Sequence, residues 1–247
     1  MTSPLALRSE RALRFFDWAF QRQFSGSFSA LRLALWGEPA AAPGRPLIIL
    51  ANHPGWWDGV LVMLVARRLF PERRCFVPMD AAALEKYGFM RRLGVFGVEQ
   101  DSPRGAIRFL ETAKEVLADP RHILWINAPG RFADPRERPV PLAPGVLRLP
   151  RLAPDAMILP LAIEYTHWTE KRGEALVGFG PPVGTASEEG IRRAMTETMD
   201  RLAQDSISRD PARFRVLVGG GRGMGGVYGL WQSLRFGAEH DSRARRG

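Results

Sequence analysis

Cysteine is almost absent from this 247-residue sequence, which contains only Cys75. A single cysteine excludes an internal disulfide framework and any cysteine-rich metal site. It also argues against redox chemistry. We assign no residue as a metal ligand.

Long apolar runs are missing as well. The longest, residues 60–66, has seven residues, whereas about 18 to 20 are needed to cross a bilayer. The N-terminal region carries Arg8, Glu10 and Arg11 and lacks an apolar core with a small-residue cleavage site, so we expect no secretory signal. A composition that is 45% hydrophobic and 25% charged excludes a disordered chain and is typical of an ordinary globular domain. Because we expect no secretory signal, we expect this domain to face the cytosol.

Acidic residues are too few to balance the basic ones, which leaves a net charge of +9. Residues 1–36 and 219–247 each contain five arginines and two acidic residues, so each end carries +3. One interpretation is a solubilising excess in an arginine-rich chain. The other is a pair of basic ends that face an anionic surface, either lipid or nucleic acid.

The first 36 residues are rich in aromatic side chains, with seven of the 24 in the chain. An apolar stripe at helical spacing predicts an amphipathic helix, and its members are Leu13, Phe16, Phe20 and Phe24. We expect residues 25–27 to interrupt this helix, residues 28–36 to form a second short helix, and residues 38–46 to be a linker. The stripe either enters a membrane interface or packs against the rest of the protein.

Beyond residue 46, short apolar runs alternate with amphipathic stretches. The runs predict strands at residues 47–51, 75–78, 95–98, 123–126, 157–163 and 175–179, and the stretches predict helices at 57–69, 103–117 and 188–208. Alternation of this kind indicates an α/β fold: a layered domain with a mostly parallel central sheet flanked by helices, plus the N-terminal amphipathic segment. We divide the chain into residues 1–36, a domain over 37–218 and a glycine-rich basic tail over 219–247.

The glycine-rich tail contains a pattern that matches the dinucleotide-binding fingerprint, at residues 221–226. That fingerprint requires a following helix in a βαβ unit and an acidic residue about 20 positions later. The remaining 21 residues are too few to supply that unit. We therefore reject nucleotide binding at this place.

The most informative pattern is Asn52-His53-Pro54-Gly55-Trp56-Trp57-Asp58. It connects a predicted strand to a predicted helix, where open α/β sheets commonly assemble their sites. Pro54 and Gly55 prevent a continuous helix, so a turn can bring the carboxylate of Asp58 back to the imidazole of His53. A carboxylate on one ring nitrogen fixes the tautomer and leaves the other nitrogen free to accept a proton. His53 is then a general base; the alternative is that it only caps the helix or fills the turn.

The same segment resembles the first signature of the glycerolipid (lysophospholipid) acyltransferase family, Asn-His, four residues and Asp. Three further blocks follow in the family's order. The second is similar to residues 94–100, with Gly97 at an aromatic position and Gln100 at an arginine position. The third is similar to residues 126–131, where Ala128 and Gly130 replace an acid and a threonine but Arg131 is retained. Residues 143–145 and the strand at 158–163 match the remaining elements.

This resemblance implies transfer of a fatty acyl group from a thioester, acyl-CoA or acyl-ACP as co-substrate with no bound cofactor, to a hydroxyl group of a lipid acceptor. His53 and Asp58 are then the catalytic pair. The residues assigned to substrate binding are Asn52, Trp56, Trp57, Glu99, Gln100, Pro129, Gly130 and Arg131. The expected partners are the lipid acceptor, the acyl donor and a peripheral membrane surface on the cytoplasmic face, without nucleic acid; the oligomeric state stays unknown.

Alternatives remain open for several of these assignments. Arg131, together with Arg136 and Arg138, either contacts a phosphate or belongs to a solvated basic loop. Trp56 and Trp57 either line a substrate channel or pack in the core. A thioesterase or lipid hydrolase using the same pair, an acyl-enzyme on Cys75, and a basic membrane- or nucleic-acid-binding module without catalysis are the competing functions.

Overall fold

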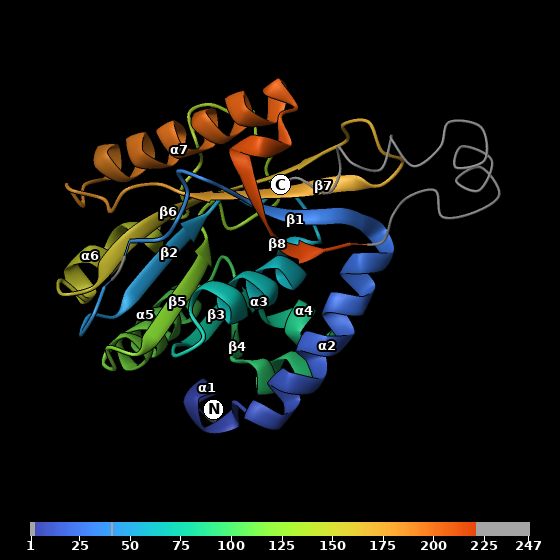
Figure 1. Cartoon of the computed structure of the whole chain (residues 1–247). Coiled ribbons are helices and arrows are strands. Elements are labelled where there is room, and N and C mark those ends of the chain that lie inside the picture. Colours follow the sequence, from blue (N-terminus) through green and yellow to red (C-terminus); the bar gives the residue numbers. More distant parts are fainter. Residues whose placement is uncertain (1–2, 41, 221–247) are drawn as a thin grey trace, which may run out of the picture.

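The computed structural model describes residues 3–40 and 42–220 (Figure 1). These residues fold around one sheet, which has eight strands. These are β1 (Phe28–Ala34), β2 (Leu47–Ala51), β3 (Arg74–Asp80), β4 (Val95–Val98), β5 (His122–Asn127), β6 (Met157–Thr166), β7 (Gly173–Phe179) and β8 (Phe214–Gly219). Their order across the sheet is β4-β3-β5-β2-β6-β7-β1-β8.

Most neighbouring strands are parallel. The β4–β3, β3–β5, β5–β2, β2–β6 and β7–β1 pairs are parallel, whereas β6–β7 and β1–β8 are antiparallel. The predicted α/β fold with a mostly parallel sheet is therefore confirmed. Carboxyl ends of parallel strands meet at one edge, so the loops after β2, β4 and β5 lie along the same edge of the sheet.

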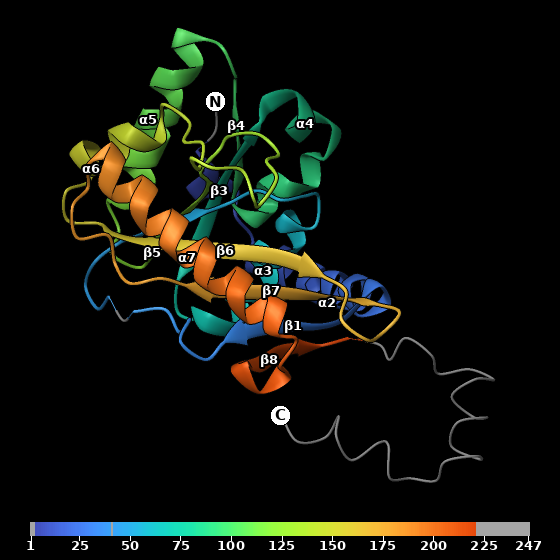
Figure 2. The same ribbon diagram turned by 90° about the horizontal axis from the view of Figure 1, so that it is seen from above.

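Helices cover both faces of this sheet. They are α1 (Pro4–Leu7), α2 (Glu10–Ser27), α3 (Asp58–Leu69), α4 (Ala81–Lys86), α5 (Pro103–Leu117), α6 (Leu149–Leu152) and α7 (Glu188–Ser208), with 3-10 turns η1 (Gly88–Leu93), η2 (Val146–Arg148) and η3 (Pro211–Arg213). In Figure 1, α7 lies on one side of the sheet and α2 and α3 lie on the other. Figure 2 shows α7 running along β6.

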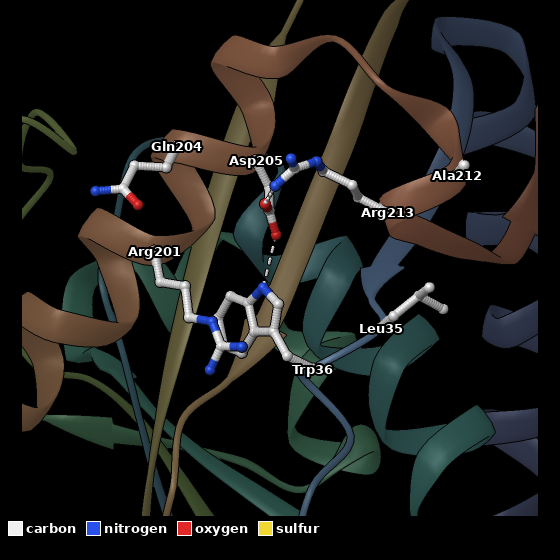
Figure 3. A pocket seen from close by; sticks show the side chains of 7 residues that line it. All are labelled: Leu35, Trp36, Arg201, Gln204, Asp205, Ala212 and Arg213. Atoms are coloured by element: carbon white, nitrogen blue, oxygen red, sulfur yellow. Dashed lines mark hydrogen bonds and ion pairs between the residues drawn. The ribbon is translucent and has the colours of Figure 1, made fainter.

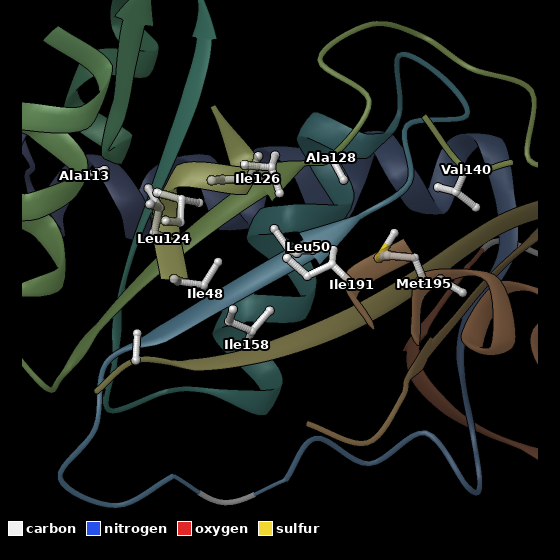
Figure 4. Packing of buried hydrophobic residues seen from close by; sticks show 14 of the residues in the cluster. Ile48, Leu50, Ala113, Leu124, Ile126, Ala128, Val140, Ile158, Ile191 and Met195 are labelled. Carbon is white, nitrogen blue, oxygen red and sulfur yellow. The ribbon is translucent and has the colours of Figure 1, made fainter. Parts of the chain in front are cut away.

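Strand β2 is buried on both faces, and all five of its residues are apolar. Side chains alternate between faces along a strand. Ile48 and Leu50 pack in the cluster beneath α5 and α7 (Figure 4), and Leu47, Ile49 and Ala51 pack in the cluster beneath α2 and α3. Hydrogen-bonded neighbours on both sides hold β2 in place, so the loop that follows Ala51 starts from a rigid position.

Helix α2 is longer than the sequence predicts, because residues 25–27 continue it instead of interrupting it. Tertiary contacts explain the difference: the Arg172 guanidinium donates to the Ser25 carbonyl at 2.7 Å, and the Ser25 hydroxyl donates to the Gly219 carbonyl at 3.0 Å. The first of these satisfies a carbonyl in the last turn of the helix, which has no partner within the helix itself.

The predicted short helix at residues 28–36 is wrong, because residues 28–34 form strand β1. This strand pairs with β7 on one side and with β8 on the other, and such long-range pairing overrides weak local helix propensity. Residues 28–34 therefore belong to the sheet, although the boundary drawn at residue 36 assigns them to the N-terminal segment. Strand β8 is a further strand that the apolar pattern does not predict.

In the described part of the chain, no helix combines the length and the apolar character that crossing a bilayer demands. The pattern at residues 221–226 and all but the first two residues of the predicted tail lie outside the described residues.

Candidate active site

The turn between β2 and α3 brings His53 and Asp58 into contact. His53 follows the end of β2 by two residues, and Asp58 is the first residue of α3. The distance between His53 Nδ1 and Asp58 Oδ2 is 2.5 Å. The geometry expected for a catalytic pair is therefore present, with the bend that Pro54 and Gly55 allow.

Asp58 has no exposed surface, and three donors surround its carboxylate. Besides His53, the Gly55 backbone N–H donates to Oδ2 at 3.1 Å, and the Tyr165 hydroxyl donates to Oδ1 at 2.5 Å. Its position in the first turn of α3 adds the favourable field of the helix N-terminus. Together these groups compensate the carboxylate for the loss of water.

Tyr165 remains a protonated donor in this arrangement. Burial, followed by the negative charge of Asp58, raises the pKa of Tyr165 far above its usual value. The phenol therefore donates to Asp58 and does not act as an acid or base near neutral pH.

The imidazole of His53 is held at one nitrogen and is partly accessible, with 21% of the side chain exposed. When Nδ1–H donates to Asp58, Nε2 carries a lone pair and can accept a proton. The ring of Phe132 lies against the imidazole, with a centroid distance of 4.4 Å, and the Ala133 N–H donates to the His53 carbonyl at 3.0 Å. The loop after β5 thus covers one side of His53.

Asn127, the last residue of β5, also reaches the histidine. Its Nδ2 lies 3.1 Å from His53 Nδ1, the nitrogen that contacts Asp58. Asn127 Oδ1 is buried and has no hydrogen-bond partner.

Sequence reasoning missed Tyr165, Asn127 and Phe132. The first two are polar residues at the carboxyl ends of β6 and β5, the two strands that flank β2. The sequence does show that a polar residue ends each of these two apolar runs. That these residues lie beside His53 follows only once the strand order is known.

Asn52 links strand β2 to strand β6 through its side chain. Its side-chain amide donates to the Ile163 carbonyl at 2.9 Å and accepts from the Ile163 N–H at 2.7 Å, and 2% of the residue is exposed. These two bonds extend the pairing of β2 with β6 by one step. Asn52 therefore presents almost no surface to a substrate, contrary to its assignment to substrate binding.

The two tryptophans of the motif have different surroundings. Trp56 is 57% exposed, so it remains a candidate wall of the site. Trp57 packs edge-on against Phe28 and Phe24, at centroid distances of 5.1 and 6.4 Å. Trp57 joins the core beneath α2, as the alternative interpretation of this residue proposed.

Glu99 and Gln100 lie on the same edge of the sheet as His53 but are not among its contacts. They follow β4, which is three positions from β2, or about 14 Å at the usual strand spacing. The ladder between β3 and β5 ends at Phe76, after which β3 continues beside β4 alone. Glu99 pairs with Arg108 at 2.7 Å, and Gln100 is exposed.

The third block forms the turn after β5. Gly130 has a φ of 69°, which favours glycine, and Pro129 precedes it. Arg131 is 58% exposed and pairs with Glu137 at 2.7 Å. The neighbouring cations are paired as well, Arg136 with Asp134 and Arg138 with Asp200. Exposed pairs of this kind contribute at most about 1 kcal/mol, so a phosphate can displace the carboxylate from Arg131.

Cys75 is a weak candidate for a catalytic nucleophile. Burial raises the pKa of its thiol to about 12, which leaves it without the thiolate that a nucleophile needs.

A second candidate site, at the surface beside α7, is also weak. A surface hollow at the C-terminal part of α7 (Figure 3) is lined by Leu35, Trp36, Arg201, Gln204, Asp205, Ala212 and Arg213. Its charged groups are already engaged: Asp205 accepts from Trp36 Nε1 and from Arg213, each at 2.7 Å, and Arg201 stacks on the indole of Trp36.

Comparison with known proteins adds one finding. A protein-family model described as Acyltransferase matches residues 33–164, which is more than half of the 247 residues. The match contains His53, Asp58, Asn127 and Arg131 and ends one residue before Tyr165. No curated protein sequence matches the chain.

Proposed function

Because the chain belongs to the acyltransferase family, which implies acyl transfer to a lipid acceptor, we propose that it uses acyl-CoA or acyl-ACP as donor and His53 as general base. The observation that carries this proposal is the contact between His53 Nδ1 and Asp58 Oδ2. It leaves Nε2 as the basic atom at the carboxyl edge of the sheet.

The reaction needs no covalent intermediate on the protein. His53 Nε2 removes the proton from the acceptor hydroxyl as its oxygen attacks the thioester carbonyl. Asp58 stabilises the imidazolium that forms. When the tetrahedral intermediate collapses, the carbon–sulfur bond breaks, the acyl group stays on the acceptor oxygen, and the imidazolium returns its proton to the leaving thiolate.

The tetrahedral intermediate carries a negative oxygen that requires hydrogen-bond donors. Candidates are backbone N–H groups around Gly130 and Arg131 or at the start of α3. The Gly130 N–H already donates to the Asn127 carbonyl at 3.0 Å. We therefore favour the Arg131 N–H in this turn.

Acceptor choice should reflect the altered second and third blocks. Gln100 and Ala128 stand where the resembled family has arginine and glutamate, and Ala128 is fully buried. Each charge-assisted hydrogen bond contributes about 1.5 to 3 kcal/mol, so contacts to a lysophosphatidate-type acceptor are weakened. We expect purified protein with labelled acyl donor to prefer a hydroxylated or glycosylated lipid over lysophosphatidate.

A panel of lysophospholipids, hydroxy-lipids and glycolipids measures this preference, and it also tests the proposed function. The Gln100→Arg variant is the matched comparison, since it restores the missing charge at an exposed position and should increase use of lysophosphatidate. Preference of the wild-type protein for lysophosphatidate above every other acceptor contradicts the expectation. Acylation of no acceptor in the panel contradicts the proposed function.

We further propose that the outer face of α2 contacts the membrane. Leu13 and Phe24 of the apolar stripe are buried, so that stripe packs against the protein. At about 100° per residue, a second face brings together Arg11, Arg14, Phe15, Trp18 and Arg22. All five are exposed, Phe15 by 60% and Trp18 by 62%. Aromatic rings flanked by arginines are typical of a helix at a membrane interface.

Charge reversal of Arg11, Arg14 and Arg22 together should weaken binding to vesicles that contain anionic lipid. Each arginine near such a surface contributes about 1 kcal/mol, so the loss of three attractions alone lowers partitioning by about 100-fold. Reversed charges also repel the anionic lipid, so we expect at least this decrease in vesicle sedimentation. Raised salt should partly release the wild-type protein.

A matched control reverses three other exposed arginines, Arg148, Arg151 and Arg193. They belong to η2, α6 and α7, which lie on the opposite side of the sheet from α2. This control should bind nearly as well as wild type. Equal binding of wild type and the folded α2 variant would show that this face is not the membrane contact.

A further inference from the structure

The contact between Asp58 and His53 Nδ1 determines which nitrogen of His53 is the base. Nδ1 has room for one hydrogen or one lone pair, yet it has two neighbours, Asp58 Oδ2 at 2.5 Å and Asn127 Nδ2 at 3.1 Å. An Nδ1–H group donates to the carboxylate and leaves Nε2 free. An unprotonated Nδ1 accepts from the Asn127 amide and places the hydrogen on Nε2, where it blocks proton abstraction.

The Asp58 contact prevails over the Asn127 contact while Oδ2 faces Nδ1, because a hydrogen bond to a charged acceptor is about twice as strong as one between neutral groups. A fully buried carboxylate depends on its hydrogen-bond donors for stabilisation. One of them, the Gly55 N–H, donates to Oδ2 at 3.1 Å. The Tyr165 hydroxyl, at 2.5 Å, is the shorter contact, and it is the donor to Oδ1.

Tyr165 is held in this position by its own surroundings. Asn52 fixes Ile163 through both backbone groups, and Tyr165 lies two residues later on the same face of β6. It pairs with Ala175 of β7. Its ring lies 5.6 Å from that of Phe28. The hydroxyl is therefore placed by the sheet and not by the turn between β2 and α3.

We propose that Tyr165 is a positioning residue that holds the Asp58 carboxylate aligned on Nδ1, and so selects the His53 tautomer with the hydrogen on Nδ1. Tyr165 acts through Asp58. The consequence for the reaction rests on the proposed function, whereas the selection of the tautomer does not.

The test is nitrogen NMR of the full-length protein labelled with ¹⁵N-histidine, at alkaline pH where the imidazole is neutral. The sequence has four histidines, and the signal lost in a His53→Gln variant identifies His53. Wild type should show the hydrogen on Nδ1. Tyr165→Phe keeps the ring but removes the donor, and should show a second population with the hydrogen on Nε2.

Two further variants make the test specific. Tyr87→Phe, at the end of α4, removes another phenol and should leave the His53 signals unchanged. Adding Asn127→Ala to Tyr165→Phe removes the competing donor and should return the ring to the Nδ1–H form. An unchanged tautomer in folded Tyr165→Phe overturns the inference, whatever the rate of reaction.

The turnover of the Tyr165→Phe variant then measures how much this positioning contributes to catalysis. With the acceptor that the wild-type protein uses, Tyr165→Phe should lower kcat by about tenfold and leave KM within about twofold, since the lost hydrogen bond acts on the base and not on substrate binding. If the tautomer responds to Tyr165→Phe but wild type transfers no acyl group, the positioning inference stands and the proposed function fails.

Discussion

Replacement of His53 by alanine is expected to remove acyl transfer almost completely. General-base catalysis contributes about 10² to 10⁴-fold, and none of the polar side chains around His53 can replace it. Asp58 is fully buried, Asn127 is a neutral amide, and Tyr165, which donates to Asp58, stays protonated. The effect should fall on kcat, because the acceptor hydroxyl can still bind but no longer loses its proton. The measurement is turnover with labelled acyl donor.

Folding should be little affected, because His53 lies in a turn and is partly exposed. The matched control is His167→Ala, which removes another exposed histidine, in the connection between β6 and β7, and should retain wild-type turnover. Circular dichroism establishes that both variants are folded. Wild-type turnover in a folded His53→Ala protein would exclude the mechanism.

Asp58→Asn should also lower turnover by about 10² to 10⁴-fold. The amide has nearly the same shape as the carboxylate but no charge to stabilise the imidazolium, and its NH₂ group can hold His53 in the unproductive tautomer. Because a hydrogen-bonding side chain remains beside Tyr165 and Gly55, the loss of stability should be much smaller than the loss of activity.

Asp119→Asn provides the comparison for this variant. It changes a carboxylate that pairs with Arg121 at the surface and should leave turnover unchanged. A folded Asp58→Asn protein with more than about half of wild-type activity would show that the carboxylate does not orient the base.

Much of the fold is readable from the sequence because the apolar pattern and the capping residues agree. Helices α5 and α7 have the predicted bounds, and each begins after a serine, Ser102 or Ser187, whose side chain accepts from a backbone N–H of the first turn. Strand β2 is a continuous apolar run, as expected for a strand buried on both faces.

Strand β1 could not be predicted in this way. Its Ser29 and Arg32 interrupt the apolar pattern, and both are satisfied by residues far along the chain. The Ser29 hydroxyl donates to the Arg172 carbonyl at 3.0 Å, and Arg32 pairs with Glu174 at 2.9 Å. Those partners become neighbours only when the sheet forms.

The candidate site likewise has a local part that the sequence predicts and a long-range part that it does not. The pairing of His53 with Asp58 follows from a local turn, and the sequence alone predicts it. The contacts of Tyr165 and Asn127 depend on β6 and β5 lying on either side of β2. Spacing along the chain carries no information about that order.

The most direct test of the account measures released thiol and acylated lipid in the same reaction, with and without the acceptor. If His53 activates the acceptor hydroxyl, thiol release requires the acceptor and equals the acylated lipid one for one. Thiol release that continues without an acceptor and yields free fatty acid, or an acyl group that remains attached to the protein at Cys75, would contradict direct transfer.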